Sequence, residues 1–125
     1  MRCVKTIELL ESELRITDEN SDYVNTEMWD EAQVFLIVAS KTGSPTTLDA
    51  AIHYSCDGGT TYAPTAAAAN IVALEAFTQV TGSTSNQVIK LHTLGRGFRV
   101  QTVLVGGSAG VGWTYYVTVV LKRLS

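Results

Sequence analysis

Residues 113–122 alternate apolar and more polar side chains with a period of two. Successive side chains of a β-strand point to opposite faces of a sheet, so this period predicts a strand with one buried face. The side chains expected on that face are Trp113, Tyr115, Val117, Val119 and Leu121. Residues 97–105 alternate in the same way. Segments of this kind have to pair into a sheet whose apolar side is covered by other parts of the chain.

Further segments are predicted to be strands, and they are 33–40, 47–56, 76–80 and 86–93. The first is almost continuously apolar, which is typical of burial on both faces. The second alternates, with Ile52 expected inward and His53 outward, and a turn at 57–60 predicts a hairpin into 61–63. Glycine-rich and polar turns recur at the spacing of a sandwich. The predicted fold class is therefore all-β, with a single antiparallel β-sandwich.

Two segments leave alternatives open. Residues 66–76 have helical character, and their alanines fit a small-residue loop equally well. Residues 6–14 fit an amphipathic helix, with Ile7, Leu10 and Leu14 at helical spacing, or an extended arm. We favour the extended arm.

Charge sets the first 30 residues apart. They contain eight acidic and three basic side chains, a net charge of −5, whereas the remaining residues have a net charge of +2. The predicted organisation is an N-terminal acidic arm over 1–30 and a β-sandwich domain over 31–125. No cluster of basic residues offers the phosphate contacts that nucleic acid requires, so nucleic acid is not an expected partner.

Length and composition indicate one globular domain. The chain has 125 residues, of which 46% are apolar and 17% charged, and it lacks the run of about 18–20 apolar residues that spans a membrane. Glu8, Glu11 and Glu13 interrupt the first apolar stretch, which argues against a secretory signal. Synthesis and folding in a cytoplasm, without contact with a membrane, are therefore expected.

The acidic run at 18–22 has the oxygen spacing that opens an EF-hand calcium loop. However, Tyr23 stands where that loop needs a glycine, and Trp29 stands where it needs a bidentate glutamate. The glycine-rich segment 106–112 lacks the lysine of a phosphate loop and precedes a predicted strand rather than a helix. We expect a solvated turn and a hairpin loop, with no bound metal or cofactor.

The residues that could carry catalysis are scattered. His53 and His92 have no carboxylate or cysteine near them in sequence and are expected on the surface. Cys3 and Cys56 are too far apart for a Cys-x-x-Cys site. Because no nucleophile and base or paired carboxylates can be identified, enzymatic activity is not expected.

Several apolar side chains fall on predicted outer faces. Tyr116 and Val120 face away from Trp113, and Val103 and Val105 face outward in their own strand. A group of apolar side chains on an outer face indicates that another protein segment packs against it. The possible covers are a partner subunit, the arm of a neighbouring copy, or the chain's own N-terminus.

Strand and turn residues of the chain resemble a known family. The segments are 34–38, 43–52, 55–62, 77–82 and 94–100, with a final strand after a glycine-serine loop. They resemble small β-sandwich structural proteins of tailed bacteriophage virions, over roughly residues 33–122. The resemblance implies a sandwich of jelly-roll type and a non-enzymatic role. The long acidic N-terminal segment departs from the family pattern.

The resemblance implies a capsid decoration, or cement, protein that binds and stabilises the shell of major capsid protein. The expected location is the capsid surface, after synthesis in the host bacterial cytoplasm, and a homo-oligomer, dimer or trimer, is expected. Arm carboxylates and aromatic or apolar side chains form the expected contact set, namely Glu8, Glu11, Glu13, Asp18, Asp22, Trp29, Tyr116 and Val120. The alternative is a carbohydrate-binding or neck- or tail-associated module that stacks sugars on Tyr62 and Tyr116.

Overall fold

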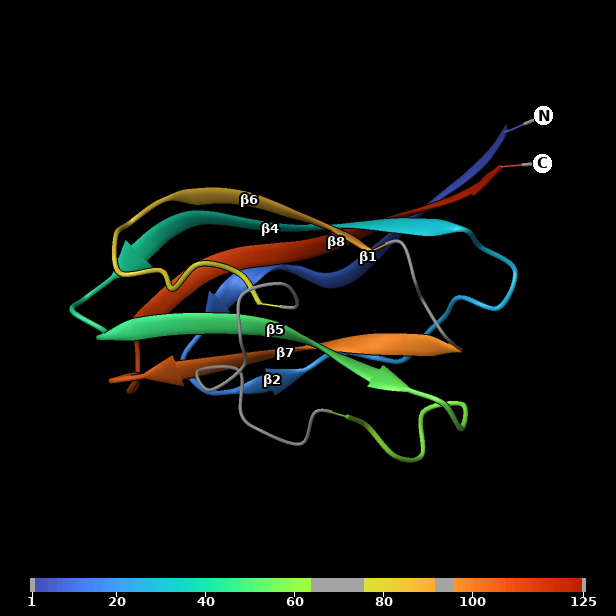
Figure 1. Ribbon diagram of the computed structural model, residues 1–125. Coiled ribbons are helices and arrows are strands. Elements are labelled where there is room, and N and C mark those ends of the chain that lie inside the picture. Colours follow the sequence, from blue (N-terminus) through green and yellow to red (C-terminus); the bar gives the residue numbers. More distant parts are fainter. Residues whose placement is uncertain (1, 64–75, 92–95, 125) are drawn as a thin grey trace.

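A computed structural model describes residues 2–63, 76–91 and 96–124, which form two antiparallel β-sheets and, within those ranges, no helix (Figure 1). The strands of the first sheet, in spatial order, are β1 (Arg2–Arg15), β8 (Gly112–Leu124), β4 (Glu31–Thr42) and β6 (Ser85–Leu91). The second sheet is built around β7 (Gly97–Val105), and its other strands are β2 (Glu19–Asn20), β3 (Val24–Asn25) and β5 (Thr47–Ser55).

The second sheet has β7 at its centre. Because β5 pairs with β7 along its whole length, β2 and β3 share the opposite edge of β7. The two sheets lie one above the other, and the two chain ends lie side by side at one end (Figure 1). This architecture confirms the predicted all-β antiparallel sandwich; the jelly-roll assignment stays a prediction. Within the described ranges, no helix has the length and apolar character needed to cross a bilayer.

The core lies between the inner faces of the two sheets. All five side chains expected on the buried face of β8 are buried, and Trp113 and Tyr115 are fully enclosed. They pack with Val34, Leu36 and Val38 of β4, and with buried side chains of β5 and β7 such as Leu48, Ile52, Phe98 and Val100. Burying each large apolar side chain contributes about 1.5–3 kcal/mol, so β8 is central to stability.

The first 30 residues are hydrogen-bonded into the sandwich. Pairing of β1 with β8 runs from Arg2 opposite Leu124 to Arg15 opposite Trp113, and β2 and β3 pair with β7. The segment 2–15 is extended, as the favoured alternative expected, and it is an edge strand of the first sheet rather than a projecting arm. Ile7, Leu9 and Leu10 pack against the core, which explains why the segment docks.

Two strands differ from their predicted burial. In β4, fully buried and half-exposed residues alternate, so this strand is covered on one face and not on both. In β5 the outer face is also buried, and His53 is only 1% exposed, so its predicted surface position is wrong. Side chains from distant segments pack against this face: Gln79 Nε2 donates to both carboxylate oxygens of Asp49, at 3.1 and 3.2 Å, and Arg99 Nη2 lies 3.4 Å from His53 Nδ1.

The chain after β5 returns along that strand. Ala63, Ala76 and Val80 form isolated bridges with Tyr54, Ala51 and Leu48, respectively. The hairpin into 61–63 is thus present as a single bridge, and the strand predicted over 76–80 is reduced to isolated bridges. Of the segment 66–76 only residue 76 lies within the described residues, so its predicted helix or loop is not described.

A buried arginine ties three strands together. Arg15, only 5% exposed, donates from Nη1 to the carbonyl oxygens of Glu11 at 2.8 Å and Tyr115 at 3.0 Å, and its guanidinium lies 4.9 Å from the centre of the Tyr115 ring. Tyr115 Oη is hydrogen-bonded at 2.7 Å to Thr102 Oγ1. This chain of contacts joins β1 to β8 and β8 to β7, and so connects the two sheets.

Stability is expected to fall at high pH because of Tyr115. Burial raises the pKa of Tyr115 to about 12, although the Thr102 hydrogen bond and the Arg15 charge oppose the shift. The folded-state pKa thus exceeds the unfolded value of about 10, so this contribution is complete below pH 10 and is lost as pH rises through 12. Denaturant titration should show the free energy of unfolding falling over this range. Tyr115→Phe should flatten the fall, whereas Tyr116→Phe, at a half-exposed position, should not; equal slopes for all three proteins would contradict this assignment.

Candidate binding surface on the outer face of the first sheet

The outer face of the first sheet carries two adjacent rows of side chains. One row runs from Glu8 through Thr118 and Phe35 to Val88, and the next consists of Tyr116, Ile37 and Asn86. Residues paired across strands point to the same face, so both rows face away from the core. We call Phe35, Ile37, Val88 and Tyr116 the outer patch.

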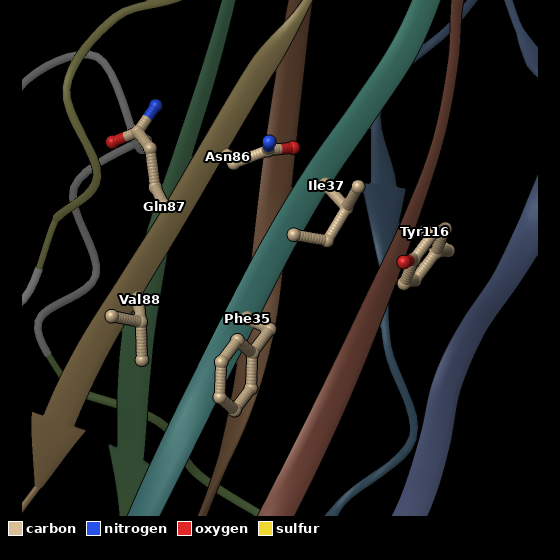
Figure 2. A pocket seen from close by; sticks show the side chains of 6 residues that line it. All are labelled: Phe35, Ile37, Asn86, Gln87, Val88 and Tyr116. Atoms are coloured by element: carbon tan, nitrogen blue, oxygen red, sulfur yellow. The ribbon is translucent and has the colours of Figure 1, made fainter.

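The outer patch lines a shallow, open hollow of ≈ 490 Å³. Figure 2 shows side chains from three neighbouring strands around it: Phe35 and Ile37 from β4, Tyr116 from β8, and Asn86, Gln87 and Val88 from β6. Val88 is 52% exposed, and the other three patch residues are half-buried. The lining offers apolar contact, the Asn86 amide and the Tyr116 phenol, and its residues include no carboxylate, histidine or thiol. Such a surface is suited to binding rather than to proton transfer or nucleophilic attack.

Gln87 anchors β6 from the other side, because it stands opposite the buried Leu36 and its side chain points away from the hollow (Figure 2). Its Oε1 accepts from the Thr78 amide at 2.8 Å, and its Nε2 donates to the Thr78 carbonyl at 2.9 Å and to Ser85 Oγ at 3.0 Å. These bonds tie β6 to the chain segment that precedes it. The strands under the outer patch are therefore fixed twice: β4 is paired with both β8 and β6, and β6 is also bonded to Thr78.

Beyond the patch, the face becomes more polar. Val120 is half-buried and stands opposite Gln33 in the row that follows Phe35. In the next row Lys122 Nζ lies 3.8 Å from Glu31 Oε1. The apolar surface thus extends as far as Val120 on β8, and in the row of this ion pair Val4 of β1, which is 56% exposed, stands opposite Lys122.

The structure gathers only part of the contact set predicted from the sequence. Tyr116 and Val120 lie on the outer face, Glu8 shares a row with Phe35, and Glu11 and Glu13 are exposed further along β1. We call the three carboxylates on β1 the acidic edge. Glu8 lies on the outer face, whereas Glu13 stands opposite the core-facing Tyr115 and lies 3.5 Å from Arg15 Nη2.

The rest of the predicted contact set lies elsewhere. Asp18 and Asp22 flank β2 in the second sheet, and Asp18 Oδ1 accepts a hydrogen bond from the Leu104 amide at 2.8 Å. Trp29 packs against the core. The sequence reasoning missed Phe35, Ile37 and Val88. An alternating reading of 33–40 would have found the first two, because they are two residues apart on the same face.

The residues around the turn after β5 build that turn. Asp57 Oδ1 accepts from Ser55 Oγ at 2.8 Å and from the amides of Thr60 at 3.1 Å and Thr61 at 2.9 Å. Nearby Arg99 lies over the Tyr62 ring, 4.0 Å from its centre, so one face of this predicted sugar-stacking ring is covered. Among the described residues no group of three His, Cys, Asp or Glu could hold a metal ion. Cys56 is exposed, and His92 lies outside the described residues.

We expect Asp57 to stabilise the fold in a pH-dependent way. Hydrogen bonds from the Thr61 amide, the Ser55 hydroxyl and the Thr60 amide lower the pKa of Asp57 from 3.8 to about 2. A lowered folded-state pKa means that the contribution is present above pH 3.8 and is lost as pH falls through 2. Asp57→Ala should therefore lower the thermal midpoint at pH 7 and have a smaller effect at pH 2. Asp22→Ala, at another exposed aspartate, is the control; an Asp57→Ala effect that did not change with pH would contradict this prediction.

The comparisons with known proteins support the fold. No family model matches the chain, and no curated protein is similar to it in sequence. Among solved structures, the chain is similar to YomS, a protein derived from the SPBc2 prophage, with 10% identity over 98% of this chain and 96% of that one and a TM-score of 0.52. It is also similar to a chain from Bacillus endospore appendages, which form disulfide-linked pili, with 18% identity over 100% and 88% of the two chains and a TM-score of 0.49. At such identities the YomS match supports a shared fold, and the second match adds no argument.

Proposed function

We propose that this protein is a non-enzymatic structural protein of a bacteriophage particle, and that it binds the capsid surface as a decoration, or cement, protein. The outer patch is the observation that carries this proposal: four apolar or aromatic side chains face outward on one sheet, and one of them, Val88, is more than half exposed. The fold similarity to a prophage-derived protein supports the phage setting.

The patch fits a protein partner better than a small substrate. Protein interfaces combine an apolar centre with a polar rim. Here Glu8 lies at one end of the row that contains Phe35 and Val88, and the Lys122–Glu31 ion pair lies two rows further along the strands. The hollow is open, so it would leave much of a small ligand in contact with water. A flat, rigid face suits a molecule that bridges subunits of the major capsid protein and adds buried area between them.

The acidic edge makes the proposal more specific. Glu8, Glu11 and Glu13 are all exposed on β1. Glu8 and Glu11 would face a basic strip on the capsid protein, whereas Glu13 lies 3.5 Å from Arg15 Nη2. Charges at the rim of an interface mainly raise the association rate and fix the orientation, and salt weakens them. Binding to shells should therefore slow as ionic strength rises, while the apolar contact persists.

The test is co-sedimentation of the purified chain with shells assembled from the major capsid protein of the phage that encodes it. We expect saturable binding with a fixed number of copies per capsid subunit, and bound shells should resist heat or denaturant better than bare shells. Failure to co-sediment at any concentration, with the chain folded, would overturn the proposal.

A further inference from the structure

The two edge strands of the first sheet are protected to different degrees. Exposed strand edges invite pairing with other chains, and natural sheets guard them with charges and bulges. The edge strand β1 has both: Lys5, Glu8, Glu11 and Glu13 are exposed, and its pairing with β8 shifts register between Glu8 and Leu10 and again between Leu10 and Glu13. This edge is therefore poorly suited to strand addition.

Among the described residues, the opposite edge strand β6 has neither a cluster of charges nor a bulge, and its one contact with the segment before it that involves Thr78 is made by the Gln87 side chain. It pairs with β4 in unbroken register, from Ser85 opposite Val38 to Leu91 opposite Ala32. Lys90 is its one charged residue, and Val88 at its centre is 52% exposed. A regular edge strand of seven residues with an exposed valine at its midpoint is a suitable template for another strand.

We propose that β6 pairs antiparallel with β6 of a second copy of this chain, about a two-fold axis that passes through Val88. In this register Val88 meets Val88 of the partner subunit, and Asn86 meets Lys90 of the partner subunit. All seven residues of the strand are then paired. Cross-strand partners share a face, so the two first sheets join into one continuous sheet with both outer patches on the same side.

Self-complementarity is the reason for choosing a second copy as the occupant. Centring on Val88 buries the most exposed apolar side chain of the strand against its own equivalent, and it places each Lys90 opposite an amide. Centring the axis on Lys90 instead would set two ammonium groups opposite each other, which destabilises a strand pair. The proposal goes beyond capsid binding and does not depend on it.

Sedimentation equilibrium of the full chain over a range of concentrations tests the register through charge. Asn86→Lys should raise the dimer dissociation constant and Asn86→Glu should lower it, each by about 2- to 30-fold, since symmetry makes every change count twice. The double variant Asn86→Lys/Lys90→Glu should restore dimerisation. Within one molecule residues 86 and 90 are about 13 Å apart along the strand, and they lie opposite the uncharged Ile37 and Gln33. The changes in the dissociation constant therefore arise from contacts between the two copies.

A second pair of variants tests the apolar centre. Val88→Lys should weaken the dimer at least about tenfold, because it removes apolar contact and sets two lysines opposite each other. Val105→Lys is the matched control: it changes a valine of similar exposure, 47%, on β7 of the second sheet, and should leave dimerisation unchanged. Circular dichroism spectra and thermal midpoints check that each variant is folded.

Three outcomes would overturn the proposal. The first is a folded wild-type chain that stays monomeric at the highest concentration. The second is a dimer whose dissociation constant does not respond to the changes at Asn86 and Val88. The third is a dimer that Val105→Lys weakens as much as Val88→Lys does, which would indicate a general effect of charge rather than a contact at β6. Because the sedimentation assay contains no shells, its failure is distinguishable from failure of the proposed function.

Discussion

Gly112→Ala is expected to abolish folding or to lower the free energy of unfolding by more than about 4 kcal/mol, the range reached when a substitution forces a backbone clash. Gly112 begins β8 at the place where this strand passes the end of β1, and a Cβ atom there would overlap the carbonyl oxygen of Arg15. The backbone cannot easily yield, because Arg15 pairs with Trp113 and Trp113 is fully buried. Denaturant titration followed by tryptophan fluorescence measures the loss.

Gly82→Ala is the matched control. A Cβ atom at Gly82 has no neighbour within 4 Å, so the free energy of unfolding should stay within about 0.5 kcal/mol of the wild-type value. A Gly112→Ala protein as stable as the wild type would contradict the close approach of β8 to the end of β1, and with it the position of β1 as an edge strand.

Ile37→Lys is expected to weaken binding to capsid shells at least about 30-fold while leaving the protein folded. Ile37 lies in the hollow between Tyr116 and Asn86, at the middle of the outer patch (Figure 2). Central apolar residues contribute most to protein interfaces, and a lysine there would lose its hydration without gaining a partner. Co-sedimentation over a range of concentrations gives the change in dissociation constant.

Two further variants make this test specific. Ile37→Ala should weaken binding less than the lysine variant, because it removes contact without adding a buried charge. Val105→Lys adds the same charge to the second sheet and should bind like the wild type. Equal losses for Ile37→Lys and Val105→Lys would indicate a general charge effect, and an unchanged Ile37→Lys would remove the outer patch from the interface.

Local alternation predicted the middle of the fold well. The predicted strand over 97–105 matches β7, and those over 47–56 and 113–122 match β5 and most of β8. These segments are regular, so each residue indicates its own face. At β1 two register shifts interrupt the period, so the pattern left a helix open as the alternative, although it favoured the extended conformation that the structure has.

Local alternation cannot predict that a side chain is buried by segments distant in the sequence. His53 alternates as an outward residue, yet it is buried on a face where Arg99 lies against it. Nothing in residues 47–56 records that contact. The prediction for Phe35 and Ile37 was wrong in the opposite direction. Their continuous apolar run predicted that both faces of the strand are covered, but one face of β4 has no second layer within the described residues. That open face is the candidate binding surface.

The position and copy number of this chain in intact virus particles test the proposed function most directly. Quantitative mass spectrometry of purified particles, combined with antibody labelling seen by electron microscopy, gives both. We predict copies on the order of hundreds, spread over the shell at symmetric junctions between capsid subunits. A few copies confined to the neck or tail, or complete absence from the particle, would contradict the assignment as a decoration protein.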